Sequence, residues 1–142
     1  MAEPKTEERD GKIIHFSVGA LIVRDNKILL MDRKKPPFGF AGPAGHIDEN
    51  EDVVTALKRE VREETGLTIK KYQLADEEFI PWNTCSRGIE GHYIYVYRCE
   101  TEGQIRSNSS EMKSLKWYDL SELDKLKLEP VWDYWLRKLK VI

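Results

Sequence analysis

The chain has 142 residues, of which 40% are hydrophobic and 34% charged, and its formal net charge is −2 with a pI near 6.0. This length suits one domain with a real core, and the balanced charge gives no general attraction to a nucleic acid polymer. Because no long apolar run or signal-peptide pattern is visible, we expect a cytoplasmic protein with reduced thiols and no membrane contact.

The chain is expected to open with a mobile segment and then a buried strand. Residues 1–11 are mostly polar, and we expect them to be mobile ahead of a single domain over residues 12–142. A strand is predicted to begin near Ile13. Its core, residues 16–23, is apolar enough to be buried on both faces of a sheet.

A tight turn and a loop follow this strand. Asp25 and Asn26 favour a hairpin turn into a second strand over residues 27–31. Residues 33–39 contain two prolines and a glycine, so they cannot continue the strand. We therefore predict a loop that leads to the next element.

Residues 45–67 hold a glycine-led acidic block followed by a helix rich in arginine and glutamate. Asn50 or Asp48 can cap this helix, whose first turn is predicted to be acidic. Gly66 is well placed to end it in a left-handed conformation. We refer to residues 45–67 as the acidic motif.

Three glutamates gather on one side of the predicted helix. At about 100° per residue, Glu60 and Glu64 lie at nearly the same azimuth as the apolar stripe, with Glu63 beside them. The plain alternative is a solvated acidic face paired with Lys58 and Arg62. A bound divalent cation would remove the repulsion between the glutamates, and clustered carboxylates are what such a cation needs.

The second half of the chain predicts more strands and a closing helix. We expect strands over residues 68–80, 92–99 and 115–118, loops over 81–91 and 103–110, a helical turn from Ser121 and an amphipathic helix over 131–139. This order suits a mixed sheet between helices.

The spacing within the acidic motif is G-x5-E-x7-R-E-U-x-E-E-x-G-U, where U is aliphatic. It resembles the signature of the Nudix hydrolase family at every specified position. The resemblance implies an α/β fold, the Nudix-type α/β/α sandwich with a mixed sheet between helices. It also implies an enzyme, a MutT-like pyrophosphohydrolase that uses Mg²⁺, or Mn²⁺ as a substitute, and a water nucleophile.

The resemblance also implies roles for single residues. Glu60, Glu63 and Glu64 would be the metal-binding carboxylates, and Glu51 and Arg59 the ion pair that orients the loop and the helix. Glu111 is a candidate to complete the metal site or to act as the base, and a solvated loop glutamate is the alternative. Ala44 stands where the family usually has glycine, and its backbone carbonyl is a candidate metal ligand.

The remaining polar and aromatic candidates concern the substrate. Arg33 could meet terminal phosphates, and Trp82 and Trp132 are candidates to stack on a base. The substrate-binding candidates are Arg33, Phe40, Trp82 and Trp132. Trp117 and Trp135 are expected in the core instead.

Zinc is disfavoured by the sequence. His15, His46 and His92 are isolated along the chain, and Cys85 and Cys99 do not form a CxxC pair.

We therefore expect a Mg²⁺-dependent hydrolase of a nucleoside diphosphate derivative. Among substrates, nucleoside triphosphates, including damaged ones, rank slightly above ADP-ribose-like compounds, and dinucleoside polyphosphates rank third. The position of Pro81 is a weak indication of an ADP-ribose-like substrate. A non-catalytic nucleotide sensor with the same fold is the alternative, and prenyl-diphosphate isomerisation is less well supported. The partner is a small-molecule nucleotide, and a homodimer remains open.

Overall fold

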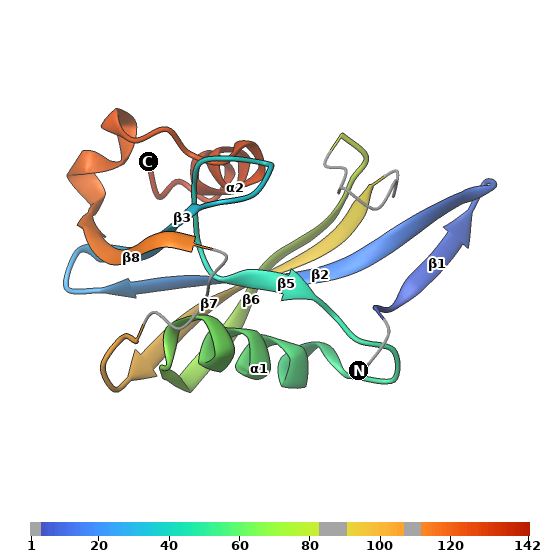
Figure 1. Ribbon diagram of the computed structural model, residues 1–142, viewed down its shortest axis with the longest axis horizontal. Coiled ribbons are helices and arrows are strands. Elements are labelled where there is room, and N and C mark those ends of the chain that lie inside the picture. Colours follow the sequence, from blue (N-terminus) through green and yellow to red (C-terminus); the bar gives the residue numbers. More distant parts are fainter. Residues whose placement is uncertain (1–3, 83–90, 107–111) are drawn as a thin grey trace.

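A mixed β-sheet lies between one helix below it and two shorter helices above it (Figure 1). The structure is a computed structural model that describes residues 4–82, 91–106 and 112–142. The strands are β1 (Thr6–Arg9), β2 (Lys12–Arg24), β3 (Lys27–Arg33), β4 (Phe40–Ala41), β5 (Ala44–His46), β6 (Thr68–Ile80), β7 (His92–Glu102) and β8 (Met112–Asp119), and the helices are α1 (Val53–Thr65), the 3-10 helix η1 (Leu120–Lys125) and α2 (Pro130–Lys138). The predicted α/β/α sandwich is confirmed.

Strand β2 organises the sheet because it pairs with four other strands. It runs parallel to β7 and antiparallel to β1, β3 and β5. β6 pairs with the outer edge of β7, while β4 and β8 pair with β3. One parallel pair among antiparallel pairs makes the sheet mixed, as expected.

Alternate residues of β2 face two separate apolar clusters. Phe16 and Val18 pack with Leu57 and the rest of the apolar side of α1. Leu21 packs with Trp135 and the apolar side of α2. This division follows from the period of two along a strand, and it explains why the apolar run of β2 is buried on both faces.

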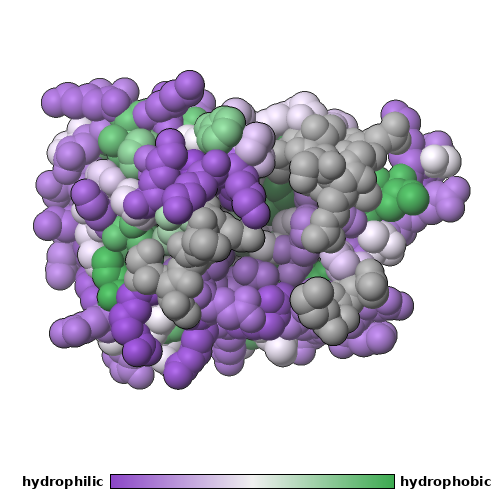
Figure 2. Space-filling view, in the orientation of Figure 1, coloured by the Kyte–Doolittle hydropathy of each residue, from purple (hydrophilic) through white to green (hydrophobic). Residues whose placement is uncertain are grey.

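The surface of α1 that faces away from the sheet is polar. Lys58 and Arg62 are exposed there, and the lower edge of the view in Figure 2 is almost wholly hydrophilic. The helix is therefore amphipathic in the usual sense, with its apolar residues directed at β2. None of the helices that the structure describes is long and apolar enough to cross a membrane.

The N-terminal segment contains a strand that its sequence does not predict. Thr6–Arg9 form β1, which pairs with the first residues of β2. Asp10 and Gly11, both with positive φ, make the tight turn between the two strands. Residue pattern alone hid this strand, because all four of its side chains are exposed.

The start of α1 also differs from the prediction. Asp52 is the N-cap, with its carboxylate accepting a hydrogen bond from the Thr55 backbone N–H at 2.8 Å, and the first turn contains no acid. Asn50 instead adopts a φ of 67° in the turn before the helix. The predicted C-terminus is confirmed, because Gly66 is left-handed with a φ of 78°.

The other predicted elements agree closely with the structure. β6 has the predicted bounds, the Asp25–Asn26 turn has positive φ at both residues, and β7 and β8 contain the predicted strands and extend them. Cys85 and Glu111 lie outside the described residues.

Candidate functional site

An ion-pair network centred on Arg59 ties α1 to the loop before it. The Nε and Nη2 atoms of Arg59 donate to the two carboxylate oxygens of Glu51 at 2.8 and 2.9 Å. Arg59 Nη2 also donates to the backbone carbonyl of His46 at 3.1 Å, and Glu51 accepts from the backbone N–H of Asp48 at 3.0 Å. The hydrogen bonds from Arg59 lower the pKa of Glu51 and those from Glu51 raise the pKa of Arg59, so both stay charged.

Glu60 occupies a confined place between Arg59 and β5. Its carboxylate accepts from Arg59 Nη1 at 2.8 Å, and its side chain is only 14% exposed. A Cβ atom on Gly45 would stand 2.2–2.3 Å from the carboxyl atoms of Glu60, so the glycine leaves the space that Glu60 fills. Burial raises the pKa of Glu60 to about 7.

The two other glutamates of the predicted set lie in different environments. Glu64 turns toward β5 and accepts from the backbone N–H of Ala44 at 2.9 Å. Glu63 is 60% exposed and lies 3.4 Å from Arg59 Nη1, the same atom that contacts Glu60. Glu60 and Glu64 therefore share the β5 side of the helix, and Glu63 lies at its open side.

A divalent cation fits the chemistry of this arrangement. All the candidate donors are oxygens, which is the ligand set of a hard ion such as Mg²⁺. The largely buried Glu60 carboxyl has a raised pKa, and a nearby cation would favour its charged form. The residues that would hold such an ion are Glu60, Glu63 and Glu64, with the backbone carbonyl of Ala44.

Two of the substrate-binding candidates make internal contacts. Arg33 Nε donates to the backbone carbonyl of Pro37 at 2.8 Å, which closes its own loop. Phe40 is half-buried, with its ring 5.5 Å from that of Tyr118 in an edge-to-face contact. Each therefore has only part of its surface left for a ligand.

The two tryptophan candidates separate clearly. Trp82 is 52% exposed, and the centroid of its ring lies 5.7 Å from that of Tyr134 in a T-shaped contact, so much of its surface is accessible among the described residues. Trp132 is 4% exposed and lies in the core, with its ring against Gly19 and Gly42. The proposal that Trp132 stacks on a base is therefore corrected: it packs between α2 and the sheet, as Trp135 does.

The view of the histidines as isolated is wrong in three dimensions. His15 Nδ1 lies 3.2 Å from His46 Nε2, and His46 Nε2 lies 3.3 Å from His92 Nε2. One ring nitrogen from each residue lies within 4.8 Å of the other two, which makes this a possible metal-binding group. His15 and His46 are 31 positions apart, and His46 and His92 are 46 positions apart. Strand pairing brings them together, so their spacing along the chain did not indicate a cluster.

A buried carboxyl that the sequence reading missed begins α2. Glu129 is 3% exposed and caps the helix by accepting from the backbone N–H of Trp132 at 3.3 Å. Burial raises its pKa. Its position directly before a proline at the start of a helix is the signal that could have identified the cap.

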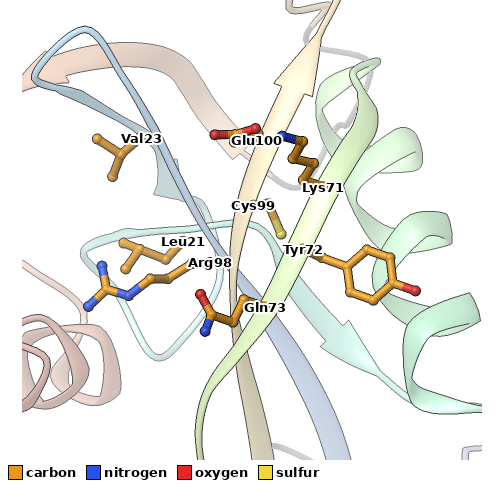
Figure 3. Close-up of a pocket in the computed structure, with 8 residues that line it drawn as sticks. All are labelled: Leu21, Val23, Lys71, Tyr72, Gln73, Arg98, Cys99 and Glu100. Carbon is orange, nitrogen blue, oxygen red and sulfur yellow. The ribbon is translucent and has the colours of Figure 1, made fainter.

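A cavity of about 570 Å³ lies on the α2 side of the sheet, away from the acidic motif (Figure 3). Arg98, Gln73 and Leu21 border it, while Tyr72 points to the opposite side of the strands, toward α1. Cys99 is buried behind this cavity, and burial raises the pKa of its thiol to about 12. A thiol in that state is a poor nucleophile.

Comparison with known proteins gives consistent matches. Residues 14–139 match the family model described as the NUDIX domain. The ADP-ribose pyrophosphatase of Methanocaldococcus jannaschii is 36% identical over 113 residues, covering 78% of this chain and 64% of that protein. The MutT-like protein of Streptomyces ambofaciens is 28% identical over 123 residues, covering 87% and 75%. The crystal structure of a MutT NUDIX hydrolase from Burkholderia pseudomallei is similar with a TM-score of 0.67 and 29% identity, covering 76% of this chain and 84% of that one.

Proposed function

This chain belongs to the Nudix family, and from that premise we propose that it is a Mg²⁺-dependent hydrolase that cleaves the diphosphate linkage of a nucleoside diphosphate derivative by attack of water. The observation that carries the proposal is the largely buried Glu60 carboxyl, which accepts a hydrogen bond from Arg59 and fills the space that Gly45 leaves. A confined carboxyl of raised pKa beside further carboxylates is typical of a cation site.

The residues of the acidic motif divide into holding and supporting groups. Glu60, Glu63 and Glu64 would hold the cation, which when bound neutralises diphosphate charge and lowers the pKa of a water ligand. Arg59 fixes the direction of Glu60, and Glu51 fixes Arg59 through two hydrogen bonds. One of the acids would accept the proton of the attacking water.

ADP-ribose-like compounds are the substrate class that we now place first, ahead of the nucleoside triphosphates that the motif alone favoured. The support is the 36% identity to a protein named ADP-ribose pyrophosphatase, of which this chain covers 64%. Trp82, exposed just beyond the end of β6, is our candidate to stack on a base.

The test is Mg²⁺-dependent hydrolysis of ADP-ribose, nucleoside triphosphates, NADH, nucleotide sugars and dinucleoside polyphosphates, followed by ³¹P NMR. We expect AMP and ribose 5-phosphate from ADP-ribose, with one atom of ¹⁸O from labelled water in one product. Glu60→Gln is expected to lower kcat by about 100-fold or more with the fold retained. The matched control is Glu102→Gln, an exposed glutamate at the end of β7, which should keep full activity.

Two results would contradict the proposal. Undiminished turnover in Glu60→Gln would show that the acidic motif does not take part in the reaction. Calorimetric binding of ADP-ribose with Mg²⁺, without any product, would instead favour a nucleotide sensor with this fold.

A further inference from the structure

Three histidines from three strands meet on the face of the sheet opposite α1. His15 lies in β2, His46 ends β5 and His92 begins β7. In the sheet register His92 is the direct partner of His15, and His46 is the partner of Ser17, which is on the same face as His15. Strand pairing therefore brings the three imidazoles together.

The distances among the ring nitrogens suit a tetrahedral metal. Nitrogens bound to zinc at about 2.0–2.1 Å in tetrahedral geometry lie about 3.3 Å from one another. The observed separations from His46 Nε2 are 3.2 Å to His15 Nδ1 and 3.3 Å to His92 Nε2. The third pair lies within 4.8 Å, and a change in side-chain torsions can close it.

Hydrogen bonding among the rings explains this cluster less well than a cation does. A neutral imidazole Nε2 offers either one proton or one lone pair, so His46 Nε2 cannot make two linear hydrogen bonds to its neighbours. A metal ion accepts a lone pair from each ring at once. Imidazole ligands select zinc and similar transition metals, in contrast to the oxygen ligands around Glu60.

Burial leaves one side of the cluster open. His15 and His92 are 4% and 5% exposed, whereas His46 is half-buried. Three protein ligands with one accessible side are the arrangement in which a metal keeps a fourth position for water or another small ligand.

We propose that His15, His46 and His92 form a second metal site, selective for Zn²⁺ and separate from the carboxylate site of α1. The two sites share β5. Gly45 leaves room for Glu60 on one face, His46 projects from the other, and the His46 carbonyl accepts from Arg59 at 3.1 Å. The proposal does not depend on the proposed hydrolysis.

The test uses the full chain without a histidine tag, since its three histidines are then the only ones present. Chelator-treated protein is titrated with Zn²⁺ against a chromophoric competitor, and with Co²⁺ while the visible spectrum is recorded. We expect one tightly bound Zn²⁺ and intense tetrahedral Co²⁺ bands. His15→Gln, His46→Ala and His92→Gln should each weaken binding by about 100-fold or more, because loss even of groups that merely support ligands costs about 10–100-fold.

Glu60→Gln is the variant that separates the two metal sites. It should retain Zn²⁺ affinity, and Mg²⁺ should not displace the bound ion. Loss of Zn²⁺ binding in Glu60→Gln but not in His46→Ala would overturn the proposal, as would a folded wild-type protein without micromolar Zn²⁺ affinity.

Imidazole ¹⁵N NMR of the wild-type chain covers the case in which a buried histidine variant fails to fold. Addition of Zn²⁺ should shift one ring nitrogen of each of the three histidines. Signals that do not move would overturn the site.

Discussion

Gly45 and Glu60 depend on each other at the level of single residues. The φ angle of Gly45 is not positive, so its backbone conformation does not require glycine and is accessible to alanine. The added methyl would stand 2.2–2.3 Å from the Glu60 carboxyl. The need for glycine here is therefore one of space for a neighbouring side chain.

Gly45→Ala should consequently reduce activity much more than stability. Glu60 ends in a flexible carboxyl that can move away, so we expect the free energy of unfolding to change by no more than about 1 kcal/mol. Displacement of a reacting or ligating group by about 1 Å can cost about 100-fold in rate, and a loss of kcat of that order is expected. Steady-state kinetics and urea unfolding measure the two effects.

Gly11→Ala is the control for this substitution. It adds the same methyl at a turn where no heavy atom lies within 4 Å of the new Cβ. Its φ of 76° predicts some loss of stability, with kcat unchanged. Normal kcat in Gly45→Ala would show that Glu60 does not need its present position.

At the scale of the element, α1 is defined by its two ends. Asp52 begins it and Gly66 ends it, with the Gly66 N–H donating to the Arg62 carbonyl at 3.0 Å. The left-handed φ of 78° at Gly66 satisfies the last turn without strain.

Gly66→Ala is expected to destabilise the protein by about 1 kcal/mol, because alanine disfavours the left-handed region. Gly66→Asn should lose less, since asparagine tolerates that conformation. Both variants add a Cβ about 3.3 Å from that of Arg106, so their difference isolates the backbone. Urea unfolding, monitored by far-UV circular dichroism, measures the free energy of unfolding of both variants. Equal losses of stability would show that contact with Arg106, and not the backbone conformation, causes the destabilisation.

The sequence predicted the presence and type of the helices and strands more reliably than the residues at which they begin and end. The ends of β6 and the left-handed end of α1 follow from apolar pattern and glycine placement, which are local properties. The N-cap was misplaced because Asp48, Asn50 and Asp52 are all good capping residues, and only the turn at Asn50 decides among them. The burial of Trp132 was readable in the same way, since α2 buries residues 131, 132, 135 and 136 in a helical repeat.

On the scale of the whole molecule, the two apolar clusters share one sheet and should unfold together. β2 contributes to both, through Phe16 and Val18 on one face and Leu21 on the other. Loss of either layer would expose the face of β2 that it covers and so weaken the strand on which the other layer packs. One cooperative transition is therefore expected for residues 12–142.

Coincident probes can check this prediction. In Trp117→Phe, Trp82 is exposed and the remaining buried tryptophans are Trp132 and Trp135, both in α2. Their urea transition should coincide with far-UV circular dichroism, which reports all elements. Two separate midpoints would mean that the α2 layer melts independently.

The histidine cluster marks where prediction from sequence ended. Its members are brought together by the parallel pairing of β2 with β7 and by the pairing of β2 with β5, both long-range contacts. A one-residue change of register would direct His46 to the opposite face. No local pattern encodes such a register, whereas Glu51, Arg59 and the three candidate metal-binding glutamates lie within one helix and its preceding loop.

Strand β5 is three residues long, yet each of its positions meets a separate demand. Ala44 packs on the α2 cluster and donates its N–H to Glu64, Gly45 makes room for Glu60, and His46 joins the histidines while its carbonyl holds Arg59. A substitution at any of these three positions is therefore expected to disturb at least one of these contacts. Over generations of mutation this strand should tolerate far fewer changes than its exposed neighbour β1, where all four side chains face solvent.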